Sequence, residues 1–374
     1  MTFAKCLRSS LTLALCLGST LLQAQTPDEV RARCRMENRP CVGLVLSGGG
    51  ARGFAHVGVI KVLEELGIRI DVIAGTSMGA MVGGAYAAGF SYEQLLSTVL
   101  GVDWDQMIAP RADRSILPFR RKLDDYKSLP VSGIEIGSDG MPQLPESFVP
   151  SEELQLFLND KTGSVAMIED LSRLSIPFAS TATDLVTGER VVMQKGCNLG
   201  EAMRASMSLP GVFAPVPFHK HLLVDGGLID NLPVELARSM GADVLIVVNV
   251  GTPLSKRSEL TSVVGVMAQM VNLLTEQNVR KSLESLGPSD VLITPDLEGF
   301  TSADLKRSAE IIERGEAAAR RAQSRLLAFA RPIEEFNSWN IARMAPFREE
   351  AQRKVHQLSD VRQGGGLPLR QSAC

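Results

Sequence analysis

The chain has 374 residues, of which 45% are hydrophobic, 22% charged and 5% aromatic, and its formal net charge is −3 at pH 7. This composition is too apolar for a disordered protein, and a chain of this length buries enough surface to fold without metal or disulfide staples. The slightly acidic balance argues against a dedicated nucleic-acid binder, because such proteins usually carry a basic domain. We therefore expect one large globular domain or two ordinary ones, with no nucleic acid as partner.

The first 24 residues are typical of a secretory signal peptide. Lys5 and Arg8 precede an apolar run of 12 residues from Leu11 to Leu22, and no acidic residue occurs before this run ends. The run is too short to span a bilayer core of about 30 Å. We expect cleavage after Ala24 and export to the periplasm or out of the cell, and an uncleaved hydrophobic N-terminus is the alternative.

Export changes how the cysteines are interpreted. Four of the six cysteines remain after cleavage: Cys34, Cys41, Cys197 and Cys374. An oxidising compartment would let Cys34 pair with Cys41 across a short charged stretch, and two unpaired thiols are the alternative. Because no group of cysteines and histidines has the spacing of a zinc site, we expect no metal.

From residue 42 onward, short apolar runs alternate with segments of helical periodicity. Strands are predicted at residues 42–46, 71–74, 178–183, 222–224, 244–250 and 291–293, and helices at 57–66, 80–88, 233–241 and 304–331. Buried strands that alternate with helices indicate an α/β fold of three layers, with helices on both faces of a mostly parallel central sheet.

The domain organisation follows from where this alternation begins and ends. We predict a signal peptide at 1–24, an N-terminal extension at 25–41, a single main domain at 42–330 and a C-terminal tail at 331–374. Within the main domain, the proline-rich residues 101–150 are interpreted as an excursion from the sheet.

A glycine-rich segment follows the first predicted strand. It consists of Gly48, Gly49, Gly50, Ala51, Arg52 and Gly53. Successive glycines can aim backbone N–H groups at one point, and the helix N-terminus behind them favours an anion there. The spacing also fits a dinucleotide-binding loop, but that site requires an acidic residue at the far end of the second strand. Asp71 lies at the beginning of that strand instead.

The second strand is followed by a G-x-S-x-G sequence, Gly75-Thr76-Ser77-Met78-Gly79. Between a strand and a helix, this sequence predicts a sharp turn that exposes the serine hydroxyl as a nucleophile. Gly75 and Gly79 remove side chains that would collide when the turn closes. A tight turn whose serine only caps the helix is the alternative.

A nucleophilic serine needs a base, and none of the histidines is well placed to be that base. The sequence contains four of them: His56, His219, His221 and His356. His56 falls in the first helix and is interpreted as structural, and His356 lies in the tail. Four residues of extended chain place His221 about 13 Å from Asp225, which is too far for a hydrogen bond. A Ser-His-Asp triad is therefore poorly supported.

Asp225 is the remaining candidate for the base. A short apolar strand carries it to a strand end, where sites in open α/β sheets lie, and Gly226 and Gly227 follow to turn the chain. A capping aspartate in a turn is the alternative.

The order of these motifs resembles the patatin-like phospholipase family. Further matches are Ala182-Thr183-Asp184-Leu185, residues 208–213 and residues 230–234, and the resemblance covers about residues 42–325. It implies a Ser-Asp dyad with Ser77 as nucleophile and Asp225 as general base, and an oxyanion hole formed by residues 48–53. It implies neither a catalytic histidine nor a cofactor. We expect no C-terminal membrane β-barrel of the kind found in some exported bacterial members.

The resemblance implies a lipid acyl hydrolase of the phospholipase A or lysophospholipase type, acting on phospholipid or another acyl lipid at a membrane surface. A thioesterase or general carboxylesterase would use the same dyad. From other classes, a non-catalytic lipid-binding module and a dinucleotide-dependent oxidoreductase are the alternatives. The sequence predicts no oligomeric state.

Two segments are candidates for contact with lipid. The apolar residues 263–274, with Met267 and Met270, form either a mobile cover or a core helix. A basic group could meet anionic head groups or be a solvated loop. Its basic members are Arg111, Arg114, Arg120, Arg121 and Lys122, and Phe119 lies among them.

Overall fold

The computed structural model describes residues 24–107, 135–136, 142–143, 152–254, 257, 260 and 263–345. The predicted signal peptide up to residue 23, the basic group between residues 111 and 122, and the residues after 345 lie outside the described residues. Export therefore stays a prediction. In the described part of the chain, no helix combines the length and apolarity needed to cross a bilayer.

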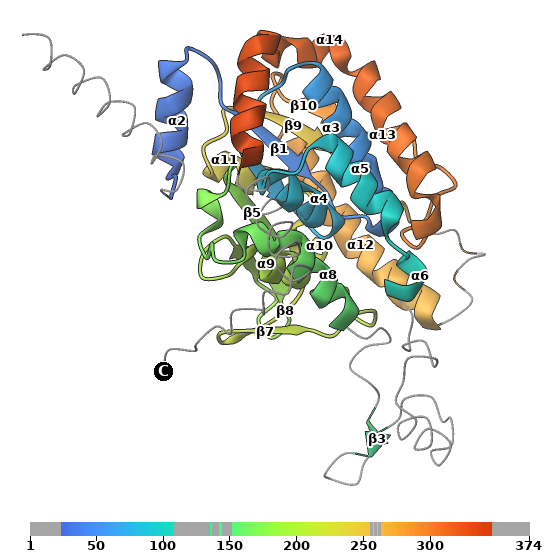
Figure 1. Cartoon of the computed structure of the whole chain (residues 1–374). Helices are drawn as coiled ribbons and strands as arrows, with labels where there is room; N and C mark the ends of the chain where they lie inside the picture. Colours follow the sequence, from blue (N-terminus) through green and yellow to red (C-terminus); the bar gives the residue numbers. More distant parts are fainter. Residues whose placement is uncertain are drawn as a thin grey trace, which may run out of the picture.

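A mostly parallel sheet forms the centre of the fold, as Figure 1 shows. Its eight described strands are β1 (Val42–Leu46), β2 (Val72–Gly75), β5 (Phe178–Asp184), β6 (Arg190–Met193), β7 (Val216–Phe218), β8 (His221–Asp225), β9 (Val244–Val248) and β10 (Val291–Ile293). They follow the order β10-β9-β1-β2-β5-β8-β7, with β6 also paired to β5. Pairing is parallel from β10 to β5 and antiparallel beyond it.

Helices cover both faces of this sheet. The main ones are α2 (Pro27–Met36), α3 (Ala55–Glu65), α4 (Met78–Ala87), α5 (Tyr92–Gly101), α8 (Glu152–Thr162), α9 (Leu199–Ser206), α11 (Val234–Ser239), α12 (Val263–Glu284) and α13 (Ser308–Arg321). Shorter elements are η2 (Gly50–Phe54), α6 (Trp104–Met107), η3 (Gly163–Val165), η4 (Leu171–Arg173), α10 (Gly227–Asp230), η6 (Leu305–Arg307), α14 (Gln323–Leu326) and η7 (Leu327–Phe329). A separate short pair, β3 (Glu135–Ile136) and β4 (Pro142–Gln143), is antiparallel.

The side chains of each central strand alternate between two hydrophobic cores. In β1, Leu44 and Leu46 join the core under α3, α4 and α13, whereas Val45 joins the core under α2 and α11. Strand side chains point to opposite faces of a sheet in turn, so a strand buried on both faces supplies two cores. The prediction of a three-layer α/β fold is confirmed.

The C-terminal part of the fold differs from the prediction. The helix expected at 304–331 ends at Arg321 and is followed by α14 and η7, and residues 333–345 of the predicted tail form another helix. Its buried Arg343 donates hydrogen bonds to the backbone carbonyl oxygens of Tyr86 and Phe90, at 2.8 Å each. Because this arginine satisfies carbonyls at the end of α4, these residues belong to the folded body and not to a tail.

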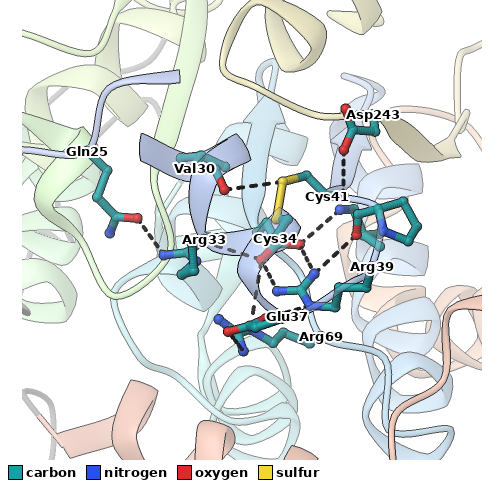
Figure 2. Close-up of a disulfide and its surroundings, with 12 residues drawn as sticks. Gln25, Val30, Arg33, Cys34, Glu37, Arg39, Cys41, Arg69 and Asp243 are labelled. Carbon is teal, nitrogen blue, oxygen red and sulfur yellow. Dashed lines mark hydrogen bonds and ion pairs between the residues drawn. A yellow bond between two sulfur atoms is a disulfide. The ribbon is translucent and has the colours of Figure 1, made fainter. Parts of the chain in front are cut away.

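A disulfide joins Cys34 and Cys41, as Figure 2 shows, so the prediction of pairing is confirmed. It links α2 to the residue before β1, beside a cluster of charged side chains. There Arg39 donates two hydrogen bonds, of 2.6 and 2.7 Å, to the buried carboxylate of Asp71. Asp71 also accepts the backbone N–H of Val42 at 2.9 Å. Asp71 therefore fixes the N-terminal extension at the beginning of β2, at the opposite end from where a dinucleotide site would need it.

Replacing both Cys34 and Cys41 by serine should lower the free energy of unfolding by about 2–3 kcal/mol, since the disulfide closes a loop with a sequence separation of 7. Urea-induced unfolding followed by circular dichroism measures this change. The same decrease is expected when the wild-type protein is reduced, and none when the double variant is. Equal unfolding midpoints for all these samples would contradict a stabilising role for the disulfide.

Candidate active site

Ser77 lies on a strained turn between β2 and α4. Its backbone has φ 52° and ψ −123°, in the region of positive φ that side chains other than glycine rarely adopt. A Cβ on Gly75 would lie 2.6 Å from the carbonyl oxygen of Gly79, and a Cβ on Gly79 would lie 2.6 Å from that of Ser47. The turn therefore closes only because both positions are glycine. The predicted sharp strand-to-helix turn is present, with the serine half-buried at its tip.

The hydroxyl of Ser77 is hydrogen-bonded to a carboxylate. Ser77 Oγ donates to Asp225 Oδ2 at 2.7 Å, and the backbone N–H of Gly227 donates to Asp225 Oδ1 at 2.7 Å. A Cβ on Gly226 would overlap the backbone carbonyl of Thr181, so this glycine lets β8 turn tightly against β5. The structure thus brings together Ser77 and Asp225, the two residues that the family resemblance pairs.

The sheet order explains how residues so distant in sequence meet. Gly75 of β2 pairs with Ser180 of β5, and Ala182 of β5 pairs with Asp225 of β8. β5 therefore separates the strand that leads to the serine from the strand that carries the aspartate. Because β8 runs antiparallel to β5, Asp225 approaches the carboxyl end of β2 from the opposite direction.

Asp225 is 5% exposed, and this burial dominates its electrostatics. Removal from water raises the pKa of its carboxyl to about 6, against the opposing effect of the hydrogen bonds from Gly227 and Ser77. At neutral pH the group is therefore ionised, yet it is a stronger base than an exposed aspartate.

The glycine-rich loop lies directly beside the serine. A Cβ on Gly48 would lie 3.0 Å from the Cβ of Ser77. The N–H of Gly48 donates to the carbonyl oxygen of Asn231, whereas the N–H groups of Gly49 and Gly50 have no acceptor among the described residues. Two backbone donors next to Ser77 are therefore left for a ligand.

The rest of the loop is held by its surroundings. Ala51 N–H donates to the carbonyl oxygen of Ser302, and a Cβ on Gly53 would overlap the side chain of Met78. The buried guanidinium of Arg52 donates to four backbone carbonyls, those of Val250, Gly251, Leu297 and Phe300. Through these four contacts Arg52 steadies the glycine-rich loop against the segments that follow β9 and β10.

His56 and His221 each have a hydrogen-bond partner other than Ser77. His56 is fully buried, and its Nε2 lies 2.8 Å from the carbonyl oxygen of Ser47. Burial lowers the pKa of His56 to about 4, so the neutral ring donates this bond. His221 Nδ1 lies 2.8 Å from Asp184 Oδ2. The structural interpretation of His56 is confirmed.

Two residues of the site were not predicted as functional. Ser206 Oγ accepts the backbone N–H of Ser77 at 2.8 Å, and Asn231 both accepts from Gly48 N–H and donates from Nδ2 to Gly48 O at 3.4 Å. Asn231 lies within one of the motifs quoted for the family resemblance, which is the signal that could have identified it. Ser206 ends α9 two residues before the quoted residues 208–213, and no motif included it.

A cavity of about 300 Å³ opens at Ser77 and Asp225. Its walls are mainly apolar and include Met78, Trp104, Leu154, Met207, Val212, Phe213 and Val271. A carboxylate and a serine hydroxyl on a mainly apolar wall suit a ligand with a reactive polar group and a hydrocarbon part.

α12 borders this cavity with Val271 and Thr275. Its outer side chains are exposed: Val266 by 46%, Met270 by 62%, Leu273 by 41% and Leu274 by 49%. These four described apolar side chains therefore lie at the surface and not in a core, whereas Val279 further along the helix is buried.

Fold and site together define an α/β protein with a serine–aspartate pair and a glycine-rich loop at one end of its sheet. Residues 44–238 match the model of the patatin-like phospholipase family. This match spans just over half of the chain, and the protein belongs to that family.

Two relatives illustrate how much of the chain is shared with known proteins. An uncharacterized NTE family protein of Mycobacterium tuberculosis is 37% identical over 223 residues, 60% of this chain and 52% of its own length. Human patatin-like phospholipase domain-containing protein 6 is 32% identical over 213 residues, 56% of this chain and 13% of its own length. The chain thus spans about half of the mycobacterial relative. Among solved structures, VipD from Legionella pneumophila is 18% identical with a TM-score of 0.42, covering 77% of this chain and 67% of VipD.

Proposed function

We propose that the protein is a serine lipid acyl hydrolase of the phospholipase A or lysophospholipase type. The observation that carries this proposal is the hydrogen bond of 2.7 Å between Ser77 Oγ and Asp225 Oδ2 in the wall of a mainly apolar cavity. The family membership supports a lipid substrate.

In the first half of the proposed reaction, Ser77 Oγ attacks the carbonyl carbon of the acyl ester while Asp225 Oδ2 takes the hydroxyl proton. The N–H groups of Gly49 and Gly50 hold the oxyanion of the tetrahedral intermediate. The intermediate then collapses to an acyl-serine, and the departing alcohol takes the proton from Asp225.

In the second half, Asp225 accepts a proton from water, and the resulting nucleophile attacks the acyl-serine. The second tetrahedral intermediate uses the same two N–H donors. Its collapse releases the fatty acid and returns the proton to Ser77. Residues of this chain supply every acid, base and donor that the proposed sequence uses.

The membrane surface is the proposed source of the substrate. Four exposed apolar side chains lie on α12, the helix that borders the cavity: Val266, Met270, Leu273 and Leu274. Contact between these side chains and lipid would bring the cavity to the surface of the bilayer. Export to an oxidising compartment belongs to the same proposal, and the disulfide between Cys34 and Cys41 is consistent with it.

Release of fatty acid from mixed phospholipid vesicles tests the function, with a Ser77→Ala variant as the reference. Activity in the wild-type protein alone supports the proposal. Hydrolysis of a short-chain thioester or carboxylic ester without any release from vesicles would favour the thioesterase or carboxylesterase alternative. Saturable vesicle binding by both proteins with no turnover of any ester would favour a lipid-binding module.

Replacing Gly50 by alanine should lower turnover by up to about 10²–10³, the loss typical of one oxyanion donor. Its φ of +56° disfavours a side chain, and a Cβ would lie 2.5 Å from the carbonyl oxygen of Ser302, so the loop must move. Steady-state kinetics on one ester should show the decrease in kcat. As a matched control, Gly188→Ala also changes a glycine with positive φ, but no atom lies within 4 Å of its added Cβ. Equal kcat values for both variants would argue against the proposed hole.

A further inference from the structure

A second cavity of about 40 Å³ adjoins the active-site cavity, and Trp104 lines both. The walls of this smaller cavity are mainly apolar. They include Met81, Val82, Phe90, Leu95, Phe157 and Met203. An apolar space of this kind stays dry and accepts hydrocarbon more readily than water.

Both cavities are lined by residues of α4, of α8 and of the C-terminal end of α9. On α4, Met78 lines the larger cavity, and Val82, four residues later, lines the smaller one. The same spacing of four residues relates Leu154 to Leu158 on α8, and it relates Met203 of α9 to Met207, the residue that caps this helix. Residues four apart lie on one face of a helix and about one turn, 5.4 Å, along it. The smaller cavity therefore continues the larger one by about one helical turn.

Trp104 is held firmly at the junction. Its side chain is 8% exposed, and its Nε1–H donates to the carbonyl oxygen of Val99 at 3.0 Å. The ring centroid lies 5.1 Å from that of Phe54 and 6.4 Å from that of Phe157. A ring fixed on three sides makes a rigid wall between the two spaces.

We propose that Trp104 closes the acyl-chain site of the larger cavity and so sets the length of acyl chain the enzyme accepts, and that the smaller cavity is the space the chain would enter if this wall were removed. This inference rests on the proposed function and specifies its substrate class. A chain that enters from Ser77 along α4 reaches the indole of Trp104 before it reaches the second cavity. Trp104 thus limits how much of the chain can be buried.

The kinetic test compares kcat/KM for p-nitrophenyl esters from butyrate to palmitate. Trp104→Ala should shift the preference toward longer chains, by about fourfold in the long-to-short ratio per additional methylene buried, which corresponds to about 0.8 kcal/mol. Trp104→Phe should shift it less. Adding Ala85→Leu, which fills the smaller cavity, to Trp104→Ala should restore the wild-type ratio. An unchanged profile in folded Trp104→Ala would overturn the proposal.

A binding test does not depend on turnover. The chain contains two tryptophans, so Trp339→Phe combined with Ser77→Ala leaves Trp104 as the one tryptophan whose emission is followed. Fatty acids brominated near the methyl end should quench this emission saturably and more strongly than those brominated beside the carboxylate. Absence of quenching, or equal quenching by both, would overturn the proposal. If no protein hydrolyses any ester, the proposed function fails, and quenching still decides whether an acyl chain reaches Trp104.

Discussion

Ser77→Ala is expected to lower fatty-acid release from phospholipid vesicles by at least about 10⁴, because it removes the atom that forms the acyl intermediate. What remains would come from the oxyanion donors and from binding alone. The fold should persist, since alanine meets the same backbone strain at φ 52° that serine already bears. Because the fold and the cavity persist, the variant should still bind a fatty acid.

The matched control for this variant is Ser97→Ala. Ser97 lies on α5 and donates its hydroxyl to the carbonyl oxygen of Gln94 at 3.1 Å, away from the cavity. The Ser97→Ala variant should leave turnover unchanged. If Ser77→Ala kept more than about a tenth of the wild-type rate, another nucleophile would have to be sought.

Asp225→Asn is expected to lower kcat/KM by about 10²–10⁴, the usual contribution of a general base. Because burial raises the pKa of Asp225 to about 6, the wild-type kcat/KM should rise about tenfold per pH unit below pH 6 and level off above it. The variant should lack this acid limb. A pH–rate profile from pH 4 to 8 measures both effects, within the range where the wild-type fold persists by circular dichroism.

The same substitution should leave the protein at least as stable as the wild type at pH 8. A carboxyl whose pKa is about 6 when folded and about 3.8 when unfolded is charged in both states at pH 8, and its burial then costs about 3 kcal/mol. As pH falls from 6 to 4, the folded state takes up its proton first, so this cost disappears. Urea unfolding at pH 8 and pH 5 should therefore show the variant's advantage shrinking with acid. A large destabilisation at pH 8 would contradict this cost of burial, and full activity in the variant would contradict the assignment of Asp225 as the base.

The activity and stability predictions for Asp225 come from one physical cause. Removal from water makes the carboxylate a stronger base, and burying its charge lowers the stability of the folded protein. Oδ1 is satisfied by Gly227 N–H, which leaves Oδ2 to Ser77. The buried charge of Asp225 thus lowers the stability of the fold, and the proposed reaction uses this same charge as its base.

Much of the fold could be predicted because its signals are local. The strand at 42–46 and the turn around Ser77 follow from apolar runs and glycines adjacent in sequence, and the structure places them where they were expected. The helix at 333–345 could not be predicted in this way. Its attachment depends on Arg343 reaching carbonyls of Tyr86 and Phe90, which lie more than 250 residues earlier in the chain.

The sequence by itself determined the residue types of the site: a serine between glycines, a loop of glycines and an aspartate before two glycines. Only the tertiary structure decided which of them meet. Ser77 and Asp225 are 148 residues apart, and the strand order β2-β5-β8 brings their side chains to 2.7 Å. Burial, the raised pKa of Asp225 and the two cavities at Trp104 depend on every element packed around them. Local patterns fix the backbone turns, whereas distances and desolvation arise only when distant segments pack together.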